Sequence, residues 1–113
     1  MRLVDLKPEW WAPPNSGRRG IAVVFDCPCC TGTPKNVRLC ISINPPLDGG
    51  APEICTGPYL YHADNLGIDG NWIGCEVAWT RKGDSFETLT LVPSVDASRA
   101  GHWHGFITNG NVA

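Results

Sequence analysis

The segment GIAVVFDCPCCTGTPKNVRLCISI, residues 20–43, decides how this chain folds. Residues 20–26 are apolar almost without interruption, which is typical of a buried strand. Residues 36–43 alternate between apolar and polar side chains, which is the pattern of a strand with two different faces. The turn Cys27-Pro28-Cys29-Cys30 lies between the two runs. The segment therefore predicts two strands that flank a cysteine-rich turn.

The rest of the chain contains further short strand-like runs and little helical pattern. Thirteen Gly and ten Pro residues interrupt it too often for long helices. Asn109-Gly110 has the composition of a hairpin turn, and only a short strand can follow it. We predict strands at residues 3–6, 72–80, 86–92 and 102–108, a turn at 81–85, loops at 45–70 and 93–101, and a short helical turn near 61–66.

These elements predict a mainly β fold. We expect one small domain over residues 1–113, built as a partly closed barrel or sandwich with little helix. Residues 45–70 are the expected loop insertion, because Pro and Gly break this stretch repeatedly.

The composition argues against several classes of protein. The net charge of −2 and the lack of a basic cluster argue against a nucleic-acid partner. No segment is long and apolar enough for a secretion signal or a membrane span, so we expect a cytoplasmic protein with no membrane contact. Thiols stay reduced in the cytoplasm, so the cysteine cluster predicts a metal site and not disulfides.

Cysteine and histidine side chains supply the ligands of a predicted zinc site. Strand residues two apart share a face, so His102 and His104 are expected to project side by side. The Cys-Pro-x-Cys turn directs Cys27 and Cys30 to one point, and zinc takes four such ligands in a tetrahedron. We predict one Zn2+ bound by Cys27, Cys30, His102 and His104, with Cys29 as the principal alternate ligand. This ion would connect the cysteine turn to the predicted strand at residues 102–108.

The same residues allow two other interpretations. The thiols could be ordinary buried side chains, which is the expected role of Cys40, Cys55 and Cys75. A redox centre at Cys27-x-x-Cys30 is disfavoured, because residues 31–34 (TGTP) forbid the helix that usually follows such a motif.

Ser94 follows a strand and a rigid proline, and it is the candidate catalytic residue. It could act as a nucleophile if a metal-bound hydroxide or a histidine lay alongside it. A serine in this position more commonly caps a turn with its hydroxyl group.

Three short motifs occur in a characteristic order. They are FDCPCCTG (residues 25–32), LTLVPSV (89–95) and HGFITNGNV (104–112). Together they resemble the small bacterial family known as domain of unknown function 6527, over the chain from about residue 20 to the end, with residues 45–70 as extra sequence. The chain departs from the family pattern at two cysteines. One falls on Thr31, beside Cys30, and the other falls on Gly101, beside His102.

The resemblance implies a small, β-rich, zinc-binding protein. Members of the family are often encoded beside ubiquitin-like conjugation machinery, and they are thought to be peptidases that trim the ubiquitin-like protein before conjugation. The implied function is therefore a zinc-dependent peptidase with a ubiquitin-like protein as its partner. The alternative is a non-catalytic protein that binds a protein partner, because two Cys and two His ligands leave no position for a zinc-bound water.

Overall fold

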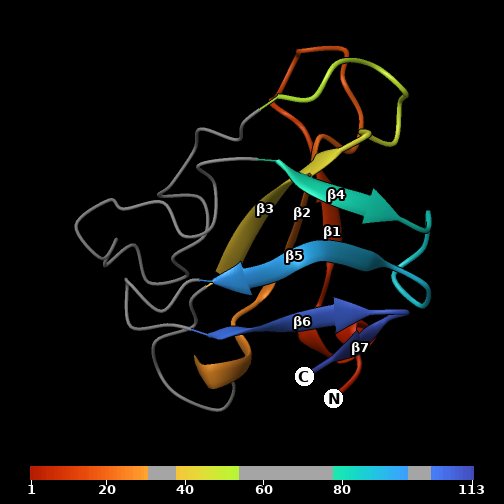
Figure 1. Ribbon diagram of the computed structural model, residues 1–113. Coiled ribbons are helices and arrows are strands. Elements are labelled where there is room, and N and C mark those ends of the chain that lie inside the picture. The colour runs from red at the N-terminus through yellow and green to blue at the C-terminus, as the bar shows by residue number, and fades with distance from the viewer. Residues whose placement is uncertain (31–37, 54–77, 97–102) are drawn as a thin grey trace.

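The computed structural model describes residues 1–30, 38–53, 78–96 and 103–113. Within them, seven strands form one curled sheet, a half-barrel in which the strands follow one another in chain order (Figure 1). The strands are β1 (Glu9–Trp11), β2 (Ala22–Asp26), β3 (Arg38–Asn44), β4 (Trp79–Lys82), β5 (Thr90–Asp96), β6 (His104–Thr108) and β7 (Asn111–Val112). Two short 3-10 helices, η1 (Leu3–Leu6) and η2 (Pro28–Cys30), complete the described elements. The prediction of a mainly β fold with little helix is confirmed.

Strands β2 and β3 carry much of the core, as the sequence of residues 20–43 predicts. They pair antiparallel, with Val24 opposite Cys40 and Phe25 opposite Leu39. Phe25 and Leu39 belong to the large apolar cluster inside the half-barrel. Val24 and Cys40 belong to a second buried cluster on the other face of the same strands. Because both faces are buried, residues 20–26 need no alternation of apolar and polar side chains.

The connection from β3 to β4 is a crossover. The two strands run parallel, with Ile43 opposite Trp79, and two parallel strands cannot be joined by a tight turn. A long segment between the two strands is therefore a geometric requirement of the fold. Residues 45–53 of the expected insertion are described and contain neither helix nor strand. The expected helical turn near 61–66 lies outside the described residues.

Two predicted strands have wrong boundaries. Strand β4 continues to Lys82, through the beginning of the turn expected at 81–85. Strand β5 begins only at Thr90 and runs to Asp96, through the beginning of the loop expected at 93–101. The register of β5 against β6 shifts between Leu91 and Val95, and this irregularity accommodates Pro93, which has no amide hydrogen for the ladder.

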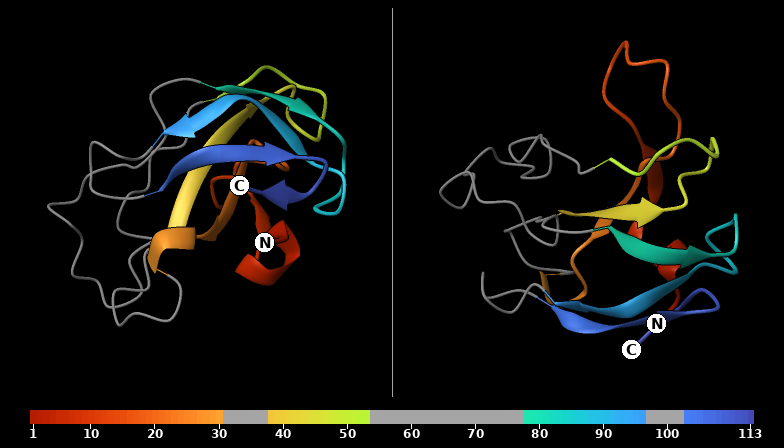
Figure 2. Two further views of the ribbon diagram at one scale, coloured as in Figure 1. Left: turned by 60° about the horizontal axis from the view of Figure 1, so that its bottom comes forward. Right: turned by 45° about the horizontal axis from the view of Figure 1, so that its top comes forward.

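The strand predicted at residues 3–6 is a 3-10 helix instead. Leu3 and Leu6 are both buried in the large core cluster. Residues three apart lie on one side of a 3-10 helix, so this conformation buries both leucines where a strand would bury only one. Leu3, the first residue of η1, also meets the C-terminal hairpin, because its amide donates to the carbonyl of Gly110 (2.9 Å). Figure 2 shows the N-terminal segment beside β7.

Arg18 joins the loop between β1 and β2 to the loop that follows β3. Its guanidinium group donates to Asp48 (2.9 Å) and Glu53 (3.0 Å). The Asp48 carboxylate also accepts the backbone amides of Arg19 (3.0 Å) and Gly50 (2.9 Å). The hydrogen bond from Arg18, followed by those two amides, holds the pKa of Asp48 well below its ordinary value.

We predict that Asp48→Asn lowers the Tm at pH 7 and that this difference shrinks as the solution becomes acidic. The folded-state pKa of Asp48 is lowered, so its stabilising effect is complete above about pH 4 and is lost as the pH falls toward the folded-state pKa. Thermal denaturation of both proteins between pH 7 and pH 2 measures the effect. A difference in Tm that stays constant over this range would contradict it.

Candidate metal centre

The cysteine turn is positioned by the end of β2. The side chain of Arg38, at the start of β3, donates to the carboxylate of Asp26 at 2.7 Å and so ties the ends of the two strands together. The next residue, Cys27, is buried, and the helix η2 follows at once. The amide of Cys30 donates to the carbonyl of Cys27 (3.0 Å), which bends the backbone so that the cysteines face a common point.

The three thiols of this turn form a cluster that could bind a metal ion. The sulfur atoms of Cys27, Cys29 and Cys30 all lie within 4.8 Å of one another. The sulfurs of Cys27 and Cys29 are 3.1 Å apart, and those of Cys29 and Cys30 are 3.7 Å apart. Sulfur ligands about 2.3 Å from a tetrahedral zinc ion lie about 3.8 Å from one another. The cluster is therefore close to the dimensions that a thiolate-bound metal requires.

The three thiols differ in how deeply they are buried. Cys27 and Cys30 belong to the large core cluster, with exposed fractions of 0% and 7%, whereas Cys29 is exposed. Burial, followed by the neighbouring thiols, raises the pKa of Cys30 to about 12. Burial and the hydrogen bond with Cys27 also raise the pKa of Cys29. A bound cation would supply the positive charge that such thiols need in order to ionise, so metal binding at this cluster would release protons.

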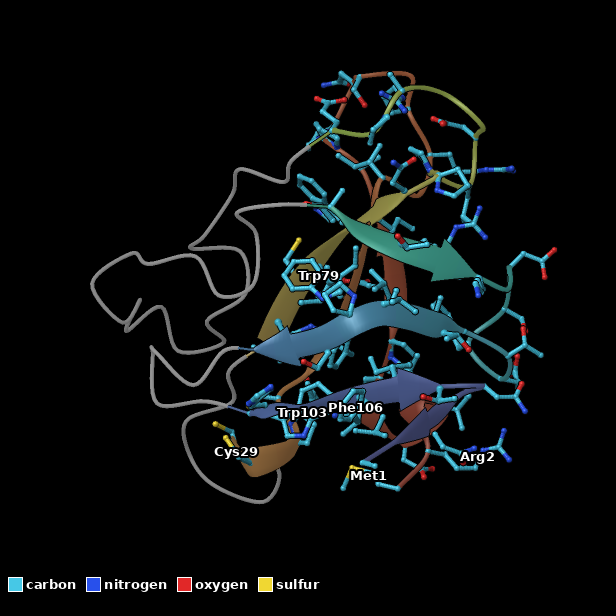
Figure 3. All side chains as sticks on the ribbon, in the orientation of Figure 1. Met1, Arg2, Cys29, Trp79, Trp103 and Phe106 are labelled. Atoms are coloured by element: carbon cyan, nitrogen blue, oxygen red, sulfur yellow. The ribbon has the colours of Figure 1, made fainter. Side chains whose placement is uncertain are left out.

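The beginning of β6 lies next to the cysteine turn. Figures 1 and 2 agree that η2 and the first residues of β6 meet at one end of the sheet, and Figure 3 shows Cys29 beside Trp103. The ring of Trp103 packs edge-on against Phe25, with centroids 6.3 Å apart. Gly105 makes this possible, since a Cβ atom there would lie 2.5 Å from the indole ring of Trp103.

The structure describes one of the two predicted histidine ligands. His102 lies outside the described residues. His104 is the first residue of β6 and is exposed, and its Nε2 atom lies 3.2 Å from the hydroxyl oxygen of Ser94 on β5. The cluster of ligand atoms found among the described residues consists of the three cysteines alone, so His104 is not part of it.

The structure answers two questions about these residues that the sequence left open. Cys29 belongs to the cluster together with Cys27 and Cys30, although the Cys-Pro-x-Cys pattern favours the outer pair. The adjacency of Cys29 and Cys30 was the signal for all three. Ser94 does not cap a turn, since it lies within β5, and its contact with His104 follows from the pairing of β5 with β6. The sequence distance between them gives no sign of this contact.

Comparison with protein families, with curated proteins and with solved structures finds no match to this chain. Among the described residues, no helix has the length and apolar character that crossing a bilayer requires.

Proposed function

We propose that this protein binds one zinc ion through the thiolates of Cys27, Cys29 and Cys30, and that the ion has a structural role. The observation that carries the proposal is the approach of the three sulfur atoms to within 4.8 Å of one another. Thiolates favour zinc among the common divalent ions of the cell, whereas magnesium and calcium prefer oxygen ligands. The described group contains no carboxylate, which agrees with this preference.

We assign the fourth ligand to His102. The start of β6 lies beside η2 (Figure 2), and His102 precedes the first residue of β6 by two positions in the chain. His104 is the weaker choice, because its Nε2 atom is engaged with Ser94 and its ring is outside the cluster. Three cysteines and one histidine complete a tetrahedron and leave no place for a reactive water.

A zinc ion held in this way would close the half-barrel at one end. Strands β2 and β6 are not neighbours in the sheet, because β3, β4 and β5 lie between them. The ion would connect the turn after β2 directly with the chain that enters β6. Since the ligand set is assembled only in the folded state, the free energy of zinc binding would contribute to folding.

The histidine pair provides the first test. We predict that His102→Ala lowers the zinc content and weakens zinc binding by at least about tenfold, whereas His104→Ala retains one zinc per chain. The two variants remove the same side chain from neighbouring positions, so each controls for the other. Elemental analysis and competition with a chromophoric chelator measure the effect. Loss of zinc in His104→Ala but not in His102→Ala would reverse the assignment, and full zinc content in both would remove histidine from the site.

A second candidate function is a zinc-dependent peptidase that trims the extended tail of a ubiquitin-like protein. The contact between Ser94 and His104 favours it, because a hydroxyl group beside an imidazole is the arrangement in which a serine can be activated. The same outer surface of β5 and β6 exposes Val92 (45%) and Phe106 (60%), which offers apolar contacts to a protein partner.

The test of this candidate uses the zinc-loaded protein and a ubiquitin-like precursor with a short C-terminal extension. A peptidase would release the extension, and Ser94→Ala would lower kcat while the zinc content stayed unchanged. A precursor that remains intact in the presence of the zinc-loaded protein would eliminate the peptidase and leave the structural role.

A further inference from the structure

The three thiols of the cluster differ in their access to solvent. Cys27 and Cys30 are buried, with exposed fractions of 0% and 7%, and Cys40 on β3 is 1% exposed. Cys29 is the exposed one among the described cysteines. A dissolved oxidant therefore reaches the sulfur of Cys29 without any opening of the core. Solvent access and thiolate character together decide which cysteine of a protein is oxidised first.

A second thiol is already in place beside Cys29. The sulfur of Cys27 lies 3.1 Å from that of Cys29, whereas the sulfur of Cys30 lies 3.7 Å away. A disulfide between Cys27 and Cys29 needs an approach of only about 1 Å. The turn that carries them is short, and its described backbone hydrogen bond joins Cys30 to Cys27. Cys29 can therefore move toward Cys27 without breaking any pairing of the β-sheet.

We propose that Cys29 is a site of oxidative modification, at which a hydroperoxide converts the zinc-bound cluster into a Cys27–Cys29 disulfide and releases the metal. This inference rests on the proposed zinc site. In the first step the thiolate sulfur of Cys29 attacks the peroxide, so that an S–O bond forms, the O–O bond breaks and the alcohol (water, for hydrogen peroxide) leaves with a proton.

In the second step the thiolate of Cys27 attacks the sulfenic acid of Cys29. The S–S bond forms, the S–O bond breaks, and the hydroxide leaves as water after taking a proton from solvent. The two thiolates are oxidised by two electrons in total, and the hydroperoxide is reduced by two. Zinc loses two of its sulfur ligands and dissociates, because Cys30 and one other group do not complete a tetrahedral site. A dithiol reductant restores both thiols and the site.

The experiment uses the full-length zinc-loaded protein, hydrogen peroxide in equimolar amount, and a chromophoric chelator that reports released zinc. Zinc release should accompany the appearance of a Cys27–Cys29 disulfide in peptide mapping by mass spectrometry, and a reductant with added zinc should reverse both. Cys40→Ser is the matched control, because it removes a buried thiol outside the cluster and should release zinc at the wild-type rate. Cys29→Ser lacks a proposed zinc ligand, so its readout is thiol oxidation: peptide mapping should show its remaining thiols oxidised at least about tenfold more slowly under peroxide.

Peptide mapping of the wild-type protein shows which cysteine is oxidised first, so the proposal can be tested even if Cys29→Ser no longer holds zinc. A first oxidation at Cys55 or Cys75, or release of zinc while Cys27 and Cys29 stay reduced, would overturn the proposal. Failure of the zinc site itself would be visible before peroxide is added, as a purified protein without metal. Peroxide added to that protein would still test the modification, with Cys27–Cys29 as the expected disulfide and any other first product as the contrary result.

Discussion

We predict that Cys30→Ser removes the proposed zinc ion and lowers the Tm by roughly 15 °C at the same time. Cys30 lies in the large core cluster and supplies one of three close sulfur atoms. A hydroxyl group in its place is a poor zinc ligand, so the cluster loses its affinity for the ion. A zinc concentration about 1,000 times the Kd stabilises the folded state by about 4 kcal/mol, and this contribution disappears with the metal.

The matched control for this variant is Cys40→Ser. Cys40 is as deeply buried as Cys27 and Cys30, but it belongs to the second apolar cluster, on the other face of β2 and β3. Serine there should cost about 1–2 kcal/mol for burying a hydroxyl group and leave one zinc per chain. Elemental analysis and thermal denaturation, with and without a chelator, measure both variants. Equal zinc contents in Cys30→Ser and the wild-type protein would refute the assignment of Cys30 as a ligand.

Gly110→Ala will destabilise the fold by about 3 kcal/mol, although the substitution adds only one methyl group. Asn109 and Gly110 form the turn between β6 and β7, with φ angles of 48° and 77°. An alanine in the left-handed region costs about 1 kcal/mol. Its Cβ atom would also collide with the backbone of Glu87, and it would lie 2.9 Å from the carbonyl oxygen of Phe86. Backbone atoms cannot rotate away, so the turn itself must shift.

A shift of this turn disturbs two other parts of the structure. The amide of Gly110 donates to the carbonyl of Leu89 (2.9 Å), and its carbonyl accepts the amide of Leu3 (2.9 Å). Both hydrogen bonds hold the hairpin against its neighbours. The expected fall in Tm is about 12 °C, measured by thermal denaturation.

The variant Gly17→Ala distinguishes the two causes of the lost stability, which are the left-handed backbone conformation and the steric contact of the Cβ atom. Gly17 has nearly the same φ angle, 72°, but a Cβ atom there would meet nothing within 4 Å. Its replacement should cost only the conformational part, about 1 kcal/mol. If both variants lose the same stability, the contact with Glu87 contributes nothing and the steric argument is wrong.

Much of the fold could be predicted because hydrophobic pattern and turn chemistry are local properties. The uninterrupted apolar run at 20–26 and the alternation at 36–43 are found as β2 and β3, and Asn109-Gly110 forms the expected hairpin turn. Residues 3–6 form a 3-10 helix where the sequence predicts a strand, because two leucines in a short apolar run fit either conformation. Only the position of the core shows that Leu3 and Leu6 must point the same way.

The candidate site was predicted in part for a similar reason. Neighbouring cysteines in a short turn cannot lie far apart, so the cluster of Cys27, Cys29 and Cys30 follows from the sequence. The contact between Ser94 and His104 depends on the register of β5 against β6, which shifts at an irregularity next to Pro93. A shift in register has no signature in the spacing of residues along the chain, so the partner of His104 could not be predicted.

The amino-acid sequence alone determined that this protein is built from short strands and that three thiols share one turn. These features arise from forces between residues close in the chain. The tertiary structure decided the parallel pairing of β3 with β4, the arrival of β6 beside the cysteine turn, and the exposure of Cys29 alone among the described thiols. Each of these depends on how the whole sheet curls around its core. The curl results from many contacts between residues far apart in the chain, and a local sequence pattern holds no information about such contacts.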